Sequence, residues 1–513
     1  MGERENRQEV IQQIVVTAEQ MRAIESRVFD AGMPVAALME KVALAIARRI
    51  QSLYPQPGRA GVLVGPGHNG GDALVVAREL HFLGWEVMVY APLQKLKELT
   101  SQHAKYAASL GIPFYQEVSP LSECDLLIDG LFGFGLERAI SEPIASAINE
   151  INQWCKPVVS IDLPSGLHTD TGEVLGTAIR ATHTFCLGLW KLGLLQERAL
   201  LYLGRVELID FDLPLADIRA VLNSQPPITR ITAASALARL PLPRSLDCHK
   251  YKNGHLLLVC GSRKYTGAAI LSGLGARASG VGMLSLAVPE SIKPLLISYL
   301  PEALVFGCPE TESGAIASLS PDLQLDSYSA IAAGPGLTPL AVAVLESLLK
   351  CDRPFVIDAD GLNILSLLGT IPSLQKRQAP TVLTPHVGEF KRLFPDFDLT
   401  NNRIHAVRQA AQKTGAVVLL KGARSTLAFP NGAISILPES TPALARGGSG
   451  DVLTGLLGGL MAQASAVSYP VEELTKTAVW WHARAGILAA QERTELGVDA
   501  FTLTQYLMQA LQK

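Results

Sequence analysis

The sequence predicts an α/β protein of two domains, each a three-layer α/β/α unit with helices on both faces of a parallel sheet. The chain has 513 residues, which is more than a single hydrophobic core normally supports. Short apolar, β-branched runs alternate with helical stretches throughout, as they do in βαβ units. The pattern loosens once, between Asp212 and Ser245, where prolines recur. We therefore expect one domain over residues 1–225 and a second over residues 226–513.

The first half opens with helices. Thr17 and Gln20 predict a capping box ahead of a helix near Met21. A second helix is expected to follow Pro34 and to run through Ile50. After it, apolar runs with the length of buried strands lie at residues 62–64, 87–89, 126–128, 158–161 and 206–209. Helical stretches separate these runs, so the strands are expected to be parallel.

The second half repeats the α/β theme after the proline-bearing segment. Prolines stand at positions 214, 226, 227, 241 and 243, and a lead-in helix is expected over residues 233–239. Strands are then expected at residues 255–260, 284–288, 330–333, 355–357, 381–383 and 417–420. Helical patterns begin at Gly450, Glu472 and Leu503. Neither half shows a fixed-period repeat or a low-complexity tract.

Composition excludes several classes of protein. The formal net charge of −3 predicts neither a basic face for nucleic acid nor an acidic tail. The 7 cysteines form no C-x-x-C pair, which favours a reducing compartment. The N-terminus is polar and lacks the apolar core of a secretory signal. The longest apolar stretches, 268–288 and 452–467, are rich in glycine, and the first contains Arg277. We expect a cytoplasmic protein that binds no membrane.

A glycine-rich turn follows the first predicted strand. It reads Gly65-Pro66-Gly67-His68-Asn69-Gly70-Gly71-Asp72 and contains the spacing G-x-G-x-x-G. Such turns let a phosphate approach a helix N-terminus. The second strand, however, ends Tyr90-Ala91-Pro92, without the acid that usually holds an adenosine ribose. The motif alone leaves a dinucleotide turn and a simple helix cap equally open.

Two more strand ends carry glycine and hard oxygen donors. One contains Asp129 and the run from Gly133 to Gly135, and the other contains Asp162 and Ser165. The carboxyl ends of parallel strands meet at one edge of a sheet, so Asn69 should lie near these groups. Carboxylate, amide and hydroxyl oxygens suit a hard cation better than zinc. A site is therefore the favoured interpretation of this edge.

From Val16 to about Asp212 the chain resembles the Rossmann-like N-terminal domain of the NAD(P)H-hydrate repair family. The resemblance rests on the segments TAEQMRAIE, GPGHNGGDALVVAR, DGLFGFG and IDLPSG. It implies that Asn69, Asp129 and Ser165 bind a potassium ion and that Asp162 contacts the substrate and shuttles protons. It also implies that two loops hold the hydrated nucleotide: His68, Asn69, Gly70, Gly71 and Asp72 in one, and Gly133, Phe134, Gly135, Leu136, Glu137, Arg138 and Ala139 in the other.

A second glycine-rich turn lies near the C-terminus and runs into an apolar helix. The backbone amides of residues 447–450 would form an anion cradle there. Asp451 adds negative charge to that cradle, which suits a base acting on an attacking hydroxyl better than a phosphate ligand. No G-x-x-x-x-G-K-[ST] segment occurs, which disfavours a Walker-type ATPase. The turn alone could also be a helix cap.

Other strand ends converge with this turn. Lys421, Gly422, Ala423, Arg424 and Ser425 follow one strand, and His386 follows another. Further strand ends give Gly334-Pro335-Gly336 and Asp358-Ala359-Asp360, and the segment Tyr265–Ala269 joins the same edge. A histidine at such a position is often only structural, but in this setting a ligand contact is favoured.

From about Thr229 onward the chain resembles the ribokinase-like dehydratase domain of the same family. The resemblance implies that Ala269, Gly336, His386 and Asp451 contact the hydrated nucleotide, with Asp451 as catalytic base. Lys421, Gly422, Ala423, Arg424, Ser425 and Gly450 would bind ADP or ATP, with a magnesium ion. Val387 and Thr338 depart from the family pattern, which has proline and glycine there.

The implied function is repair of hydrated NADH and NADPH: epimerisation of the R and S forms, and nucleotide-dependent dehydration of the S form. A homo-oligomer is expected, with no nucleic-acid partner. Two alternatives stay open at this point. The second half could be a small-molecule kinase whose product keeps its phosphate, and the first half could be a non-catalytic binding module.

Overall fold

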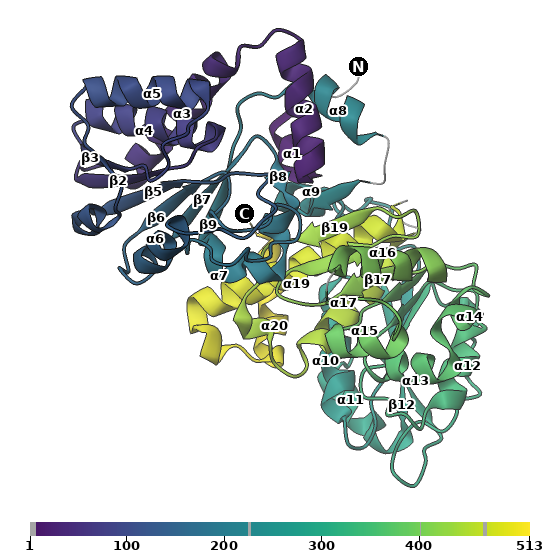
Figure 1. Cartoon of the computed structure of the whole chain (residues 1–513). Helices are drawn as coiled ribbons and strands as arrows, with labels where there is room; N and C mark the ends of the chain where they lie inside the picture. Colours follow the sequence, from purple (N-terminus) through teal and green to yellow (C-terminus); the bar gives the residue numbers. More distant parts are fainter. Residues whose placement is uncertain (1–6, 224–226, 401, 465–468, 513) are drawn as a thin grey trace. The chain divides into compact units, whose positions relative to one another are not determined.

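The computed structural model describes residues 7–223, 227–400, 402–464 and 469–512. The chain divides into two compact units, Met1–Gln225 and Pro226–Lys513 (Figure 1). Each unit is built on its own large sheet in which most neighbouring strands are parallel. The predicted fold class is confirmed. No helix in the described ranges is long and apolar enough to cross a bilayer.

The sheet of unit 1 has seven strands in the order β4-β3-β2-β5-β6-β7-β9, all parallel. Each strand expected from an apolar run is present, and β4 and β7 are additional. The bounds are β2 (Arg59–Val64), β3 (Glu86–Tyr90), β4 (Phe114–Tyr115), β5 (Leu126–Gly130), β6 (Val158–Ile161), β7 (His183–Leu187) and β9 (Arg205–Ile209).

Helices cover both faces of this sheet. Val62 and Val64 of β2 pack into one apolar cluster with α3 and α4, and Leu63 between them packs into a second cluster with α6. In Figure 1, α3, α4 and α5 lie together on one side of the strands. The bounds are α3 (Val35–Leu53), α4 (His68–Phe82), α5 (Glu98–Ser109), α6 (Ile144–Ile151), α7 (Leu200–Leu203) and α8 (Leu215–Leu222).

A small two-stranded sheet fixes the N-terminal helices. β1 (Val15–Val16) pairs in parallel with β8 (Trp190–Lys191), and Val16 stands opposite Lys191. The predicted capping box is confirmed, because Thr17 accepts a hydrogen bond from Gln20 N and the Gln20 side chain accepts one from Thr17 N. α1 (Arg7–Gln13) precedes this pair and α2 (Ala18–Asp30) follows it.

The sheet of unit 2 has ten strands in the order β10-β19-β18-β17-β16-β15-β14-β11-β12-β13. Most neighbouring strands are parallel, but β18 runs antiparallel to both β17 and β19, and neither β18 nor β19 is among the strands expected from the sequence. The bounds are β10 (Ile228–Arg230), β11 (His255–Val259), β12 (Met283–Pro289), β13 (Leu304–Cys308), β14 (Ala330–Ala333), β15 (Phe355–Ile357), β16 (Thr381–Leu383), β17 (Val417–Leu420), β18 (Ser425–Ala428) and β19 (Ile434–Leu437).

The segment expected as a loose boundary is more ordered than its prolines suggest. It contains α8, the strand β10, and α9 (Ala233–Leu237), which has its own capping box at Thr232. β10 joins the edge of the unit 2 sheet by pairing in parallel with β19. The proline-rich pattern therefore marks a change of unit but not an absence of secondary structure. Residues 224–226 lie outside the described ranges.

Two glycine-rich helices pack closely in the core of unit 2. α10 (Thr266–Ala278) and α17 (Ser449–Ala462) approach so tightly that a Cβ on Gly455 would lie 1.8 Å from Ser272 O. A Cβ on Gly275 would lie 2.2 Å from Val452 O. A Cβ on Gly448, before α17, would lie 2.6 Å from Leu271 Cδ1, and one on Gly459 would lie 2.0 Å from Ser279 Oγ. From Gly448 to Gly459 the contacts therefore advance in the same direction along both helices, so α10 and α17 are parallel and both begin at the same edge of the sheet.

The remaining helices of unit 2 complete its two outer layers. They are α11 (Lys293–Tyr299), α12 (Val342–Leu349), α13 (Asp360–Leu368), α14 (Thr370–Leu374), α15 (Val387–Leu393), α16 (Arg403–Thr414), α19 (Val471–Arg493) and α20 (Ala500–Tyr506). The helical patterns expected from Gly450, Glu472 and Leu503 correspond to α17, α19 and α20.

Candidate active sites

In unit 1 the strands β2, β5 and β6 are neighbours, and their C-terminal ends bring the expected oxygen donors to one edge. Asp129 at the end of β5 is completely buried. Its carboxylate accepts hydrogen bonds from Ser160 Oγ at 2.8 Å, Ser165 N at 2.8 Å and Ser165 Oγ at 2.6 Å. Burial raises its pKa, opposed by these hydrogen bonds. Asp129 and Ser165 therefore form one tightly bonded buried pair.

Asn69 lies in the first turn of α4, and its backbone oxygen would be 3.0 Å from a Cβ on Gly130, the residue after Asp129. A Cβ on Gly133 would lie 3.2 Å from Asn69 Oδ1 and 3.1 Å from Asp162 Oδ2, so the glycine loop passes closely over both side chains. Asn69 Nδ2 is buried and has no hydrogen-bond partner among the residues that the structure describes. An unsatisfied buried amide at this place is costly unless a ligand completes it.

Asp162 follows β6 in the left-handed region, with φ of +69°. Its Oδ1 pairs with Lys191 Nζ at 2.6 Å, and its Oδ2 accepts a hydrogen bond from Phe134 N at 2.9 Å. Lys191 has no exposed surface and also donates to Leu187 O. Burial lowers the pKa of Lys191, but Asp162 and other nearby acids raise it more. The two side chains form a buried ion pair at the floor of the site.

A cavity of about 620 Å³ opens above this ion pair. The lining includes members of both predicted substrate loops, namely His68, Asn69, Asp72, Gly133, Phe134, Gly135 and Leu136, together with Asp162. Asp129 and Ser165 are buried outside its lining, and Glu137, Arg138 and Ala139 are not among the lining residues. The volume falls in the range of ordinary small-molecule sites.

Two of the expected substrate-loop glycines have packing roles. A Cβ on Gly70 would lie 2.0 Å from Gly65 O, and one on Gly71 would lie 2.8 Å from the Met39 sulfur. Gly70 is therefore required where the turn brings its Cα against the backbone of Gly65, while Gly71 lies where the end of the Met39 side chain of α3 packs against α4. Neither glycine is among the lining residues of the cavity.

The cavity also presents charged side chains that the sequence did not single out. Arg22 and Glu25 come from α2, Lys97 precedes α5, and Lys191 comes from β8. Asp72 of α4 also lines the cavity, and burial together with Asp162 and Glu25 raises its pKa well above the usual value. Lys191 stands inside the otherwise apolar run of residues 185–195. A single lysine in such a run is the sequence signal that could have pointed to this ion pair.

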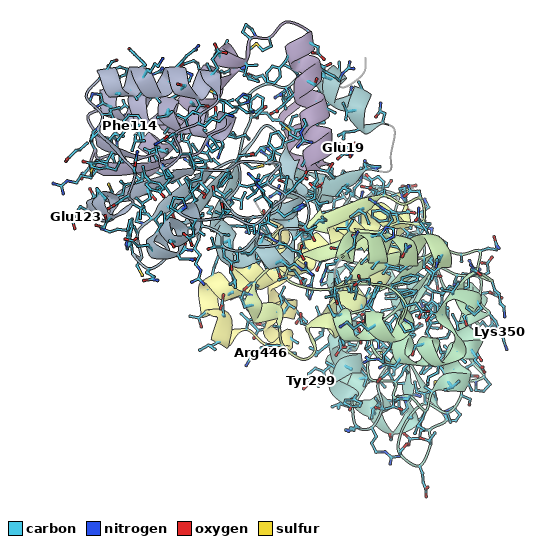
Figure 2. All side chains as sticks on the ribbon, viewed as in Figure 1. Glu19, Phe114, Glu123, Tyr299, Lys350 and Arg446 are labelled. Carbon is cyan, nitrogen blue, oxygen red and sulfur yellow. The ribbon has the colours of Figure 1, made fainter. Side chains whose placement is uncertain are left out.

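In unit 2 the predicted catalytic base stands in the first turn of α17. Gly448 caps the helix in the left-handed region, with φ of +92°. Burial raises the pKa of Asp451 to about 7, and Asp358 adds to this effect while Lys421 opposes it. Arg446, labelled in Figure 2, holds the preceding loop by donating to Leu496 O and Val498 O.

A buried ion pair lies next to Asp451. Lys421 Nζ, just past β17, is 2.7 Å from Asp358 Oδ1, just past β15. Thr454 of α17 donates to the other Asp358 oxygen at 2.7 Å. A Cβ on Gly450 would lie 3.3 Å from Lys421 Nζ, so the predicted nucleotide contacts Gly450 and Lys421 are neighbours. Asp358 was recognised as a strand end but was not included among the predicted site residues.

Gly336 and the start of α10 also meet at this edge. Gly336 has a φ of +67°, and a Cβ there would lie 2.8 Å from Tyr265 Cβ. The Ala269 side chain is completely buried. Because this value covers the whole residue, the backbone of Ala269 is also buried, and Ala269 presents no exposed surface to a ligand in this structure. Gly422 and Ala423 are exposed beyond β17, and Ser425 begins β18.

His386 has a clear structural role. It caps α15, where its Nδ1 accepts hydrogen bonds from Gly388 N and Glu389 N. The Glu389 carboxylate accepts a hydrogen bond from His386 N at 2.8 Å, which completes a capping box. The histidine side chain is 56% exposed, so the ring is accessible to a ligand while it caps the helix.

The departure at Thr338 has a visible cost. Thr338 has a φ of +67°, a conformation that glycine adopts without strain. Its N–H donates to Asp360 Oδ2 at 3.0 Å, but within the described part of the chain its buried Oγ1 has no hydrogen-bond partner. The glycine that is common at this position in the family would avoid both costs.

Comparison with known proteins follows the division into units. Residues 35–193 match the family model described as YjeF-related protein N-terminus, and residues 256–509 match the model described as NAD(P)H-hydrate dehydratase. A Synechocystis protein named bifunctional NAD(P)H-hydrate repair enzyme is 55% identical, covering 97% of this chain and 94% of its own length. A Thermosynechococcus vestitus protein of the same name is 51% identical, covering 97% of each chain.

A solved structure is similar to part of the chain. The Bacillus subtilis ADP/ATP-dependent NAD(P)H-hydrate dehydratase, co-crystallised with ATP and Mg²⁺, is 31% identical in sequence. It matches 54% of this chain and 96% of its own length, with a TM-score of 0.46.

Proposed function

The chain belongs to the bifunctional NAD(P)H-hydrate repair enzyme family, and from that premise we propose what each unit does. Unit 1, residues 1–225, interconverts the R and S hydrates of NADH and NADPH. Unit 2, residues 226–513, dehydrates the S hydrate, converting ADP to AMP or ATP to ADP with release of phosphate. The observation that carries this proposal is the similarity, over nearly the full length of the chain, to proteins named bifunctional NAD(P)H-hydrate repair enzyme. In addition, each unit has an aspartate–lysine ion pair at its candidate site.

The chemistry of unit 1 suits its buried polar floor. Carbon 6 of the hydrate carries a hydroxyl and is bonded to the ring nitrogen, so it can invert through loss and return of oxygen. This requires proton transfer and a fixed electrostatic environment, but no redox group. Asp162 lines the cavity with one oxygen held by Lys191, and we assign it as a proton-transferring residue.

The residues of unit 1 fit a monovalent cation. Asn69, Asp129 and Ser165 offer amide, carboxylate and hydroxyl oxygens, and Asp129 is bonded to hydroxyls and backbone amides. We propose that these three residues hold a potassium ion, which would supply positive charge near the loop that covers Asn69. The loops at His68–Asp72 and Gly133–Ala139 are proposed to hold the hydrated nucleotide.

In unit 2 a direct loss of hydroxide is slow because hydroxide is a poor leaving group. We propose that Asp451 takes the proton of the carbon 6 hydroxyl as that oxygen attacks the terminal phosphoryl group of the nucleotide. The ring nitrogen then supplies the electron pair that expels phosphate and restores the reduced ring. The amides before α17 would stabilise the transferring phosphoryl group.

The nucleotide is proposed to contact Lys421–Ser425 and Gly450, with the hydrate against Ala269, Gly336, His386 and Asp451. Among the described residues, no three His, Cys, Asp or Glu side chains are grouped to hold a metal. A magnesium ion would therefore be carried mainly by the nucleotide phosphates. A cytoplasmic location, a homo-oligomer and the absence of nucleic-acid and membrane partners stay predictions of the sequence.

The decisive experiment incubates the full chain with each separated epimer, first without nucleotide and then with ADP or ATP in turn. Interconversion without nucleotide and recovery of reduced-nicotinamide absorbance with stoichiometric free phosphate are expected. A phosphorylated hydrate that accumulates without release of phosphate would identify a kinase instead. Failure to interconvert the epimers would leave unit 1 as a binding module.

A further inference from the structure

Glu25 is a carboxyl group of the unit 1 cavity that the proposed mechanism does not use. It is half-buried and lines the cavity together with Asp162 and Lys191. Among the described residues, its carboxylate takes part in no hydrogen bond or ion pair. A carboxyl group that faces a ligand-sized cavity without a partner is available for proton transfer.

The fold anchors Glu25 against the ion pair. α2 begins at Ala18, two residues after Val16 pairs with Lys191 across β1 and β8. Ala18 N also donates to Asp170 Oδ1 at 2.8 Å. Met21, Ile24 and Val28 form the buried stripe of the helix, and residue 25 adjoins that stripe. Glu19, labelled in Figure 2, is exposed on the same helix.

Glu25 faces charged groups on several elements. Arg22 is on its own helix, Asp72 on α4, Asp162 after β6 and Lys191 on β8, while His68 and Lys97 line the same cavity. Burial raises the pKa of Glu25 to about 7, Lys191 and Arg22 oppose that rise, and Asp162 adds to it. Asp162, in contrast, pairs with Lys191 and accepts a hydrogen bond from Phe134 N. Carboxyl groups in such different environments usually divide the acid and base roles.

We propose that Glu25 is the second catalytic carboxyl group of the epimerase, donating a proton to the carbon 6 oxygen while Asp162, held by Lys191, acts as the base. This inference rests on the epimerase function proposed above. Glu25 donates its proton to the hydroxyl as the C6–O bond breaks, and water leaves with the bonding electron pair. The lone pair of the ring nitrogen forms a double bond to carbon 6.

The second half of the reaction restores the hydrate. Asp162 takes a proton from a water molecule that attacks carbon 6 from the opposite face, and the C=N electron pair returns to the ring nitrogen. One water has left and one has entered, and solvent returns the proton from Asp162 to Glu25. In the reverse direction the two groups exchange roles. The active form is therefore the one in which the two carboxyl groups share a single proton.

The test uses the full chain, purified R hydrate and no nucleotide, with chromatographic separation of the epimers. Glu25→Gln is expected to lower the epimerisation rate by about 10²-fold or more. In the wild type the epimerisation rate should fall as pH rises through about 7, the value to which the pKa of Glu25 is raised. This decrease at alkaline pH, the alkaline limb of the pH–rate profile, should be absent in Glu25→Gln. Glu25→Asp should keep the limb at a lower rate, and Glu19→Gln should match the wild type.

Two further readouts separate catalysis from folding and from the broader function. Dehydration of the S hydrate with nucleotide should be unchanged in Glu25→Gln, because unit 2 performs it. Inversion in oxygen-labelled water should place solvent oxygen on carbon 6. Wild-type rate in Glu25→Gln, persistence of the alkaline limb in that variant, or inversion without label would overturn the proposal. A wild-type chain that interconverts no epimer would refute the epimerase function itself.

Discussion

Replacing Asp451 by asparagine should make unit 2 inactive and, above neutral pH, more stable. The substitution removes the proposed base but preserves side-chain shape in the first turn of α17. Loss of a general base typically lowers a rate by about 10²–10⁴-fold. Epimerisation should continue at the wild-type rate, because Asp162 belongs to the other unit.

The expected gain in stability follows from the pKa of Asp451. Its pKa rises from 3.8 to about 7 on folding, chiefly through burial. The folded chain therefore holds this proton more tightly than the unfolded chain does. The resulting stabilisation is complete below about pH 3.8 and is lost as pH rises through 7. At about 1.36 kcal/mol per pH unit, ionising Asp451 costs the folded state about 4 kcal/mol, or about 2 kcal/mol if partial exposure halves the shift.

The same pKa sets the pH dependence of catalysis. A base must be ionised, so dehydration by the wild type should fall about tenfold per pH unit below pH 7. The assays are initial rates of S-hydrate dehydration from about pH 5 to 9, and the denaturant midpoint of the unit 2 transition over the same range. The difference in stability between the variant and the wild type should grow from pH 4 to 7 and then level off.

Two results would refute this reasoning. Dehydration near the wild-type rate in Asp451→Asn would remove Asp451 from the mechanism. A variant that is less stable than the wild type at pH 8 would show that ionised Asp451 is not penalised in the folded chain, so that contacts with Lys421 outweigh burial. Ser449→Ala, in the same helical turn, is a matched control that removes a hydrogen bond to His482 without touching the carboxyl group.

Four further predictions follow from the structure. Lys191→Met leaves the buried Asp162 side chain without its ion-pair partner, so the free energy of unfolding of unit 1 should fall by about 3–5 kcal/mol. Adding Asp162→Asn should recover much of that loss, as measured in a double-mutant cycle. Exchange of potassium for tetramethylammonium should slow epimerisation and spare dehydration; equal rates would remove the cation from Asn69, Asp129 and Ser165. Thr338→Gly relieves a φ of +67° and a buried hydroxyl without a partner, so unit 2 should gain about 1 kcal/mol in denaturant unfolding, and a loss would show that the threonine is not strained. Separate chains of residues 1–225 and 226–513 should each fold. The second chain alone should repair only the S form of a mixed hydrate sample, and adding the first chain should complete the repair. Folded fragments that fail to complement each other would contradict two independent enzymes.

Many residues of the unit 1 site could be predicted from the sequence because the C-terminal ends of parallel strands lie at the same edge of a sheet. Asp129, Asp162 and Ser165 follow neighbouring strands, so their convergence required only the strand pattern. The glycines of α17 could be recognised as unusual, but their function in packing against α10 needed coordinates. The reversal at β18 could have been suspected from Pro430-Asn431-Gly432, a turn signal between two apolar runs.

Glu25 and Lys191 could not be placed by the same reasoning. β8 contains only Trp190 and Lys191, too short for any periodic pattern. Its pairing with β1 brings Glu25 toward Lys191 across most of the length of unit 1, and this pairing depends on tertiary structure rather than on local sequence. For His386 the sequence could not separate a structural role from a functional one. Its exposed side chain caps α15 and can still face a ligand.

The two units have unrelated sheets but arrange their charges alike. In each, a buried aspartate just past one strand is paired with a lysine from another, at 2.6 Å for Asp162–Lys191 and 2.7 Å for Asp358–Lys421. In each, a second carboxyl group has a pKa raised to about 7 by burial and by that aspartate, namely Glu25 and Asp451. In each unit the ion pair therefore lies near a second carboxyl group whose pKa is raised to about 7, close to the pH at which proton transfer is most effective. In the proposed mechanisms both units transfer protons at the carbon 6 oxygen, and the two sheets place the residues proposed for this chemistry at different strands.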